Sequence, residues 1–357
     1  MKRNYLLIAC TAILISACKK DSVPDFKMPE NADQPLAVTV AAVQPLVVTT
    51  IAGLARSVGY VDGVGNGARF AYPDGIDVTD DGTIYIADTF NNAIRKISPS
   101  YVVSTVKIPK STDGQTLRFP HRLRVMKDGT INILTVNSYL LPNHKVWILK
   151  PDGKVLTADF KPGYRTYNAL ERDPYTDYLW IGGNMNANDG TIKDEFGVFE
   201  KFIIKNKLIG TDNTYLPRKS LLAEDALAIK STLISSTRTF FCGYNNIKYL
   251  VFGGKHIYKL TSSGQFSVIF KDLDFTNIRC LVVTKDSRTI YVADNGRIKS
   301  IFNNKLTYLA GPQPPHDGGD GTGSSADVDA DQLALANDES ALYFTDRSGI
   351  IRKITLR

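Results

Sequence analysis

Three features are scarce in this 357-residue chain, and each scarcity excludes a class of protein. Four cysteines are too few for a domain held together by disulfide bonds. Four histidines, none of them paired at a metal-binding spacing, argue against a zinc centre. The excess of positive charge is also small. A net charge of +7 does not by itself indicate nucleic-acid binding.

Long hydrophobic runs and catalytic motifs are missing as well. No segment beyond the N-terminus has the eighteen or so uncharged apolar residues that a membrane-spanning helix needs. The sequence has no nucleophile elbow, phosphate-binding loop or dinucleotide-binding fingerprint. We therefore expect a binding protein in preference to an enzyme, with no catalytic residue, metal or cofactor assigned.

The N-terminus has the pattern of a secretion signal that ends at a cysteine. A short basic segment precedes an apolar run of about twelve residues, Leu6–Ala17, and small residues stand before Cys18. This ending resembles the lipobox of bacterial lipoproteins, and the Lys-Lys-Asp that follows is similar to the tether of lipoproteins from the Bacteroides group. The resemblance implies a signal peptide over 1–17, a lipidated Cys18 with a flexible tether over 18–44, and an outer-membrane location facing either side.

Two cysteines remain after this processing, Cys242 and Cys280. They could pair in the oxidising environment of the envelope, or they could be two buried thiols on neighbouring strands. The sequence leaves both possibilities open.

The rest of the chain repeats a pattern of four short strands joined by tight turns. The clearest copy runs over residues 73–106, and an Asp-Gly pair makes its first turn because glycine accepts a positive φ. Asp88 stands at the end of its second strand, where Asp294 and Asp346 stand in other copies. We interpret these three aspartates as hydrogen-bonding scaffold.

The last copy stops before its fourth strand, and the missing strand is found at the other end of the chain. Residues 47–53 have the form of the fourth strand at 306–311. The N-terminal strand is therefore predicted to complete the C-terminal blade and to leave no free edge. Six copies divide residues 46–357 into units of about 52 residues.

The first and last copies resemble the NHL repeat, in "YIAD…NNAIRKI" and "YFTD…GIIRKI". The resemblance implies an all-β fold over 45–357, a six-bladed β-propeller of four-stranded blades. NHL propellers are mainly binding platforms, and a minority of related six-bladed propellers are enzymes.

In a propeller, the loops that precede the inner strands lie around one mouth of the central channel. Aligning the copies places six polar residues there, namely Asp74, His121, Asn168, Arg238, Arg279 and Gln332. These residues could simply contact water. Alternatively they form a ring for a polar ligand, and two arginines and a histidine against one aspartate favour an anionic one.

Other loops on the same face supply further candidates. Tyr139, Asn184 and Asn186 are suited to sugar hydroxyls, or they belong to ordinary polar loops. The alternating carboxylates in residues 327–332 resemble part of a calcium loop, but the glycine and distal glutamate are missing and a solvated acidic turn is the simpler interpretation.

The ring also bears on the enzymatic alternative. Gluconolactonase-like propellers hold a divalent metal with oxygen ligands, which only Asp74, Asn168 and Gln332 could supply. Amidating-lyase-like propellers bind zinc through several histidines, and only His121 falls on the ring. Neither ligand set is complete.

These observations predict a monomeric, lipid-anchored protein of the cell envelope whose loop face binds a partner protein or a polysaccharide. The lipid is its only expected contact with the membrane. The alternative is a hydrolase or lyase, lactonase-like, that acts at the channel mouth. Nucleic-acid binding is not expected, because secretion separates the domain from regulated RNA.

Overall fold

Short β-strands and turns make up nearly all of the computed structural model, which describes residues 46–135, 145–159, 165–185, 195–201, 204–205, 208–209, 212–217, 221–225, 239–311 and 318–357. The strands lie within the compact unit Pro45–Arg357. The predicted signal peptide, Cys18 and the tether lie outside the described residues. Within the described ranges, no helix has the length and hydrophobicity that crossing a bilayer requires.

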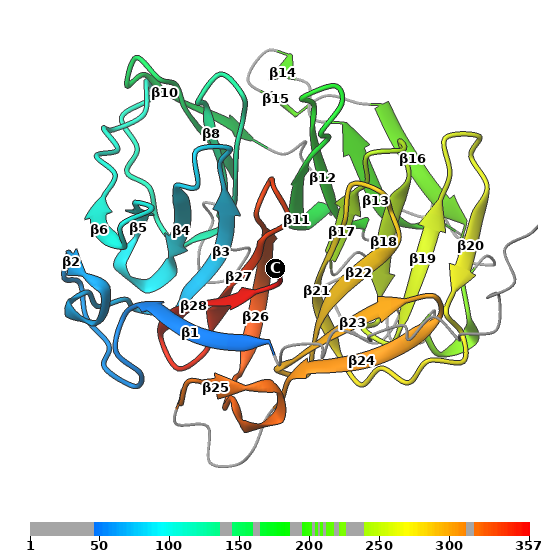
Figure 1. Cartoon of the computed structure of the whole chain (residues 1–357). Coiled ribbons are helices and arrows are strands. Elements are labelled where there is room, and N and C mark those ends of the chain that lie inside the picture. Colours follow the sequence, from blue (N-terminus) through cyan, green and yellow to red (C-terminus); the bar gives the residue numbers. More distant parts are fainter. Residues whose placement is uncertain are drawn as a thin grey trace, which may run out of the picture. The chain divides into compact units, whose positions relative to one another are not determined.

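The described strands form six sheets, and each sheet runs outward from one inner strand (Figure 1). Each inner strand contacts the inner strands of the two neighbouring sheets, so that they close into a ring around a central channel. The inner strands are β3 (Pro73–Val78), β7 (Pro120–Val125), β11 (Arg165–Arg172), β17 (Thr239–Cys242), β21 (Ile278–Val283) and β26 (Ala330–Leu335). This arrangement is an all-β propeller, as the repeat predicted.

The outer strands follow in antiparallel order from each inner strand. The second strands are β4 (Ile84–Asp88), β8 (Ile131–Thr135), β12 (Leu179–Met185), β18 (Lys248–Phe252), β22 (Thr289–Asp294) and β27 (Ala341–Asp346). The third strands are β5 (Ala93–Ile97), β9 (Lys145–Leu149), β13 (Glu195–Lys201), β19 (His256–Leu260), β23 (Arg297–Phe302) and β28 (Ile350–Thr355). The fourth strands are β6 (Val102–Thr105), β10 (Val155–Asp159), β16 (Asp212–Pro217), β20 (Phe266–Ile269), β24 (Lys305–Ala310) and β1 (Val47–Ala52).

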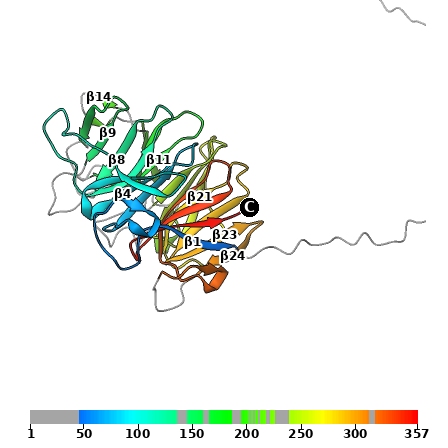
Figure 2. The same ribbon diagram turned by 60° about the vertical axis from the view of Figure 1, so that its left-hand side comes forward.

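The N-terminal strand closes the ring, as predicted. Strand β1, blue in Figures 1 and 2, pairs antiparallel with the red β28, and Val48 lies opposite Ile354. The first and last repeats therefore share one sheet, which removes the free strand edge that an unclosed propeller would expose.

The prediction of four strands per sheet is wrong for three of the six sheets. Additional short strands extend them at the outer edge, namely β2 (Gly63–Val64), β25 (Gly321–Thr322), β14 (Ile204–Lys205) and β15 (Leu208–Ile209). The connectors that carry β2 and β25 are fixed by an aspartate just before each strand. Asp62 accepts a hydrogen bond from the backbone amide of Thr105, at 3.0 Å, and Asp320 accepts one from Thr50, at 2.9 Å.

Three buried ion pairs hold the ends of second strands, and they confirm the scaffold interpretation of the repeated aspartates. The pairs are Asp88 with Arg95 (2.8 Å), Asp294 with Lys299 (2.6 Å) and Asp346 with Arg352 (3.4 Å). Breaking one such pair by removing one partner typically costs about 3–5 kcal/mol, because the remaining buried charge is left uncompensated.

Apolar side chains fill the space between neighbouring sheets. One cluster joins Phe70 and Ile76 with Ala334 and Ile351, and each of these side chains is buried. At the channel, the packing of β3 on β7 depends on Gly75. A Cβ atom on this residue would lie 2.7 Å from the carbonyl oxygen of His121, so that only glycine allows the two strands to approach as they do.

Candidate functional site

The channel mouth is formed where the inner strands begin. In five of them a β-bulge interrupts the pairing with the second strand. Four of the predicted ring residues occupy these bulges, namely Asp74, His121, Asn168 and Arg279. The structure therefore places them at equivalent positions, as the alignment predicted.

The prediction of Gln332 for this ring is wrong by one residue. Leu333 pairs with Phe344 as Ile76 pairs with Ile86, which makes Asp331 the counterpart of Asp74. The error arises because the last pair of β26, Leu335 with Leu342, spans one residue more than the last pair of β3, Val78 with Ile84. The Gln332 side chain is instead buried and donates to the carbonyl oxygen of Asp331.

Asp74, His121 and Arg122 form a hydrogen-bonded cluster at the mouth. Asp74 Oδ2 lies 2.5 Å from His121 Nδ1, and its Oδ1 accepts a hydrogen bond from Arg122. Burial acts to raise the pKa of Asp74, but the charges of Arg122 and His121 outweigh burial and lower that pKa to about 2. Asp74 is therefore ionised at neutral pH and holds both partners in place.

A second group of charges lies at the start of β26. Arg279 Nη1 donates to Asp329 Oδ1 at 2.7 Å, and Arg279 and Arg347 each place Nε 3.9 Å from Asp331 Oδ1. Burial and the nearby charge of Asp74 raise the pKa of Asp331. Asp329 and Asp331, which the ring prediction omitted, thus contact the predicted Arg279, and Arg347 contacts Asp331.

This pairing contradicts the expected surplus of positive charge at the mouth. The arginines that the structure describes there face carboxylates, with Arg122 on Asp74 and Arg279 on Asp329. The acidic segment 327–332 is likewise not a solvated turn, because Asp329 and Asp331 face Arg279. The alternation of aspartates in that segment was the sequence signal for these arginine partners.

Of the remaining predicted residues, Asn168 and Asn184 lie on described strands. Asn168 lies in the bulge of β11 and has a polar contact. Asn184 pairs with Thr166 in β12, and its side chain lies outside the described residues. Arg238, Tyr139, Asn186 and Cys18 also lie outside the described residues.

An exposed aromatic platform flanks the Asp74 cluster, and sequence reasoning missed it. Tyr72 and Phe90 stack at a centroid distance of 4.8 Å, and Phe119 meets the edge of Phe90 at 6.4 Å. Tyr72 and Phe90 are 56% and 59% exposed. Tyr72 stands two residues before Asp74, and Phe119 stands two residues before His121. The platform therefore joins two neighbouring sheets beside the mouth.

The backbone holds this platform rigidly. Phe90 N donates to Ala71 O at 3.0 Å, and Phe119 N donates to the Asn92 side-chain oxygen at 2.9 Å. Tyr72 and Phe119 both adopt positive φ, 60° and 48°, which is unusual for bulky residues. Such strain persists where the surrounding structure imposes it, and it is concentrated at ligand-binding positions.

The two remaining cysteines are free and buried, on the adjacent inner strands β17 and β21. Of the two possibilities left open by the sequence, the structure therefore has the buried thiols. Burial raises the pKa of both, which makes them unreactive near neutral pH. Across the described part of the chain, no group of three or more histidine, cysteine, aspartate or glutamate side chains is arranged to hold a metal.

Comparison with known proteins identifies the repeat. Residues 70–97, which include β3, β4 and β5, match the NHL repeat family. The chain therefore contains an NHL repeat within its β-propeller. No curated protein matches the chain in sequence.

Solved structures show the same fold at low sequence identity. A Bacteroides thetaiotaomicron protein of unknown function superposes with a TM-score of 0.60 at 17% identity, covering 87% of this chain and 76% of that one. An auxiliary nutrient binding protein from Bacteroides ovatus gives 0.60 at 13%, with coverages of 87% and 76%. A streptogramin B lyase gives 0.54 at 14%, with 88% and 99%. These likenesses establish the β-propeller fold.

Proposed function

We propose that this six-bladed NHL propeller is a lipid-anchored envelope protein that binds a neutral glycan on its loop face as a step in nutrient capture. Two structural neighbours, from Bacteroides ovatus and Bacteroides thetaiotaomicron, are named auxiliary nutrient binding proteins. The secretion signal and Cys18 supply the envelope location and the lipid anchor in this proposal.

The observation that carries the proposal is the aromatic platform beside a charged cluster. Sugar rings present C–H faces that stack on aromatic rings, and their hydroxyl groups need donors and acceptors at the edge of the stack. Tyr72 and Phe90 supply the exposed rings. His121 and Arg122, still 21% and 12% exposed, supply polar groups next to them.

Charge pairing at the mouth favours a neutral glycan over an acidic one. Arg122 and Arg279 are each neutralised by a carboxylate, so that an acidic sugar would have to displace Asp74 or Asp329. A neutral sugar can accept and donate hydrogen bonds without breaking these pairs. This reverses the preference for an anion that the ring alone suggested.

Affinity electrophoresis tests the proposal with amylopectin, xylan and mannan as neutral glycans and polygalacturonate as the acidic one. We expect retardation by a neutral glycan and a loss of about tenfold in affinity for Phe90→Ala, which removes a stacked anchor worth about 1–3 kcal/mol. Phe302→Ala is the matched control, because Phe302 is 49% exposed and lies on β23. If no glycan retards the protein and a partner protein binds in a way that Phe90→Ala abolishes, the loop face binds a protein and the glycan proposal is wrong.

Membrane fractionation tests the anchor. Because Cys18 is the proposed acylation site, Cys18→Ala should move the protein from the membrane pellet to the soluble fraction, while Cys10→Ala should leave it in the pellet. Equal distribution of the two variants would contradict the lipid anchor.

The alternative, a lyase or hydrolase, rests on His121. Its ring is oriented by Asp74, and this pairing of an imidazole with a carboxylate is what a general base requires. A structural neighbour is named a streptogramin B lyase. If the mouth is catalytic, His121→Asn should abolish turnover of a bound glycan or lactone while leaving its binding within about threefold.

A further inference from the structure

The opposite end of the channel contains a pocket that the loop-face proposal does not use. It lies where the inner strands end, has a volume of about 100 Å³, and is lined by side chains from all six sheets. A liquid water occupies about 30 Å³, so this space holds about three waters. A whole sugar ring is too large for it, and a molecule of a few heavy atoms fits.

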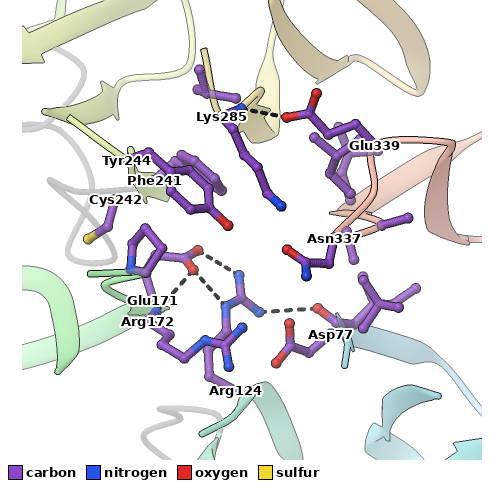
Figure 3. Close-up of a pocket in the computed structure, with 18 of the residues that line it drawn as sticks. Asp77, Arg124, Glu171, Arg172, Phe241, Cys242, Tyr244, Lys285, Asn337 and Glu339 are labelled. Carbon is purple, nitrogen blue, oxygen red and sulfur yellow. Dashed lines mark hydrogen bonds and ion pairs between the residues drawn. The ribbon is translucent and has the colours of Figure 1, made fainter. Parts of the chain in front are cut away.

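One wall of the pocket is a fully paired arginine. Arg124 donates from Nε and Nη2 to the two carboxylate oxygens of Glu171, at 3.0 and 2.7 Å (Figure 3). Its Nη1 donates to the carbonyl oxygens of Ile76 and Leu123. Every nitrogen of this guanidinium is therefore used by the protein, which makes it a fixed wall rather than a free ligand-binding group.

Three donors face the pocket without a partner. Figure 3 shows the Lys285 ammonium, the Tyr244 hydroxyl and the Asn337 amide directed toward the middle of the space. Within the described residues, none of these three side-chain groups has a hydrogen bond or ion pair. Lys285 Nζ lies 5.7 Å from the Tyr244 ring centroid. Two of the three donors, on the turns that follow β21 and β17, are therefore close together.

The rim that carries Lys285 is held in place by its own backbone. Lys285 N donates to Glu339 Oε1 at 2.5 Å, which joins the turn after β21 to the turn after β26. The Lys285 side chain can therefore reach inward from a fixed base. Converging donors on a fixed rim are suited to a carboxylate group.

The pocket also offers an anionic group to a ligand. Asp77 Oδ2 accepts the backbone amide of Val125 at 2.7 Å, and its other oxygen has no hydrogen-bond partner in the described structure. Figure 3 places Asp77 on the other side of Arg124 from Glu171. A partly buried carboxylate with spare acceptor capacity is suited to an ammonium group.

The balance of charge decides between classes of ligand. Three cations and four carboxylates line the pocket, namely Arg124, Arg172, Lys285, Asp77, Asp80, Glu171 and Glu339. A phosphate, with up to two negative charges, would face this net negative lining unfavourably. A molecule that carries both an ammonium and a carboxylate satisfies both kinds of wall. Phe241 and Tyr244 add an aromatic surface for an apolar substituent.

We propose that this pocket, which we call the turn-end pocket, binds a small zwitterion with the chemistry of a free amino acid. The carboxylate of the ligand would contact Lys285 and Tyr244, and its ammonium would contact Asp77. The pocket would then be a second binding site, separate from the loop face.

Isothermal titration calorimetry on the whole protein tests the proposal with small free amino acids, with glycine and alanine as the first probes. The comparison compounds are propionate, ethylamine, inorganic phosphate and glucose. Saturable binding of an amino acid, weakened at least tenfold when either charge is missing, is the expected result. Equal or tighter binding of propionate, phosphate or glucose, or no binding by any amino acid, would overturn the proposal.

Two variants locate the binding. Lys285→Met removes an exposed ammonium, and Asp77→Asn keeps an acceptor for Val125 while removing the charge; each should weaken amino-acid binding at least tenfold. Lys305→Met is the control, because it removes an exposed lysine on β24 and should leave binding unchanged. An equal loss in all three variants, or in none, would place the ligand elsewhere.

The two proposed sites can fail separately. Glycan retardation should be the same in Lys285→Met as in the unaltered protein, and amino-acid binding should be the same in Phe90→Ala. A loss of both activities in either variant would contradict the assignment of two independent sites.

Discussion

The two ends of the channel use charged side chains in opposite ways. At the loop mouth, Asp74 contacts both His121 and Arg122, and the exposed surface beside this cluster is aromatic. At the turn end, Arg124 and Glu171 satisfy each other, but Lys285 and Asp77 keep unused hydrogen-bonding capacity toward the pocket. Paired charges fix the shape of a site, and unpaired ones are free for a ligand.

The largest expected effect comes from breaking the paired wall of the turn-end pocket. Glu171→Gln should lower the free energy of unfolding by about 3 kcal/mol, because Arg124, whose side chain is only 12% exposed, loses its neutralising partner. Urea denaturation measures this. The double variant Arg124→Leu with Glu171→Leu should recover most of the loss, since it removes both charges. A double variant as unstable as the single one would show that packing and not charge is responsible.

The next largest effect is on the pH dependence of the free energy of unfolding, which should differ between the two ends of the channel. The pKa of Asp74 is about 2 in the folded protein and about 3.9 in an unfolded chain. Its ionisation therefore contributes about 2 kcal/mol of stability above pH 4, which is lost as the pH falls from about 4 toward 2. Urea denaturation of Asp74→Asn should show a weaker dependence on pH in this range.

Asp77 at the turn end supplies the comparison. Burial raises the pKa of Asp77 despite the charges of Arg124 and Arg172, so that its ionised form is disfavoured in the folded protein. Protonation of Asp77 as the pH falls through that raised pKa adds relative stability, the reverse of Asp74. Asp77→Asn should therefore increase the loss of stability on acidification. The same acid response in both variants would contradict the contrast between the ends.

The smallest expected effect on stability concerns the aromatic platform. Tyr72→Gly relieves a positive φ, which favours glycine by about 1 kcal/mol, but it removes a stacked pair worth about the same. The free energy of unfolding should stay within about 1 kcal/mol of the unaltered protein, while glycan affinity falls about tenfold. A loss of more than 2 kcal/mol in thermal or urea unfolding would make the platform a structural element.

Much of the fold could be predicted because propeller strands pair with their neighbours in the chain. The turn residues and the strand-like form of residues 47–53 were enough to predict that β1 completes the sheet of β28. The extra strands β2 and β25 were missed, because two-residue strands carry no periodicity. The backbone amides that fix these strands, Thr105 for Asp62 and Thr50 for Asp320, are shown only by the structure.

The candidate site was harder to predict because its contacts join neighbouring repeats. Alignment placed Asp74, His121 and Arg279 at equivalent positions, but it could not show that Arg122 reaches Asp74 or that Asp329 reaches Arg279. The error at Gln332 came from a single additional residue in a turn. The aromatic platform was missed because Tyr72, Phe90 and Phe119 are separated in sequence and belong to three different loops.

The sequence by itself determined the repeat, the order of strands within each sheet and the closure of the ring, because hairpin pairing depends on local turns and alternating apolar residues. The tertiary structure alone decided which charges meet in the channel. Asp74 and His121, like Arg124 and Glu171, are 47 residues apart. Contacts over that separation depend on how neighbouring sheets pack and twist around the channel, which no short segment of the sequence encodes.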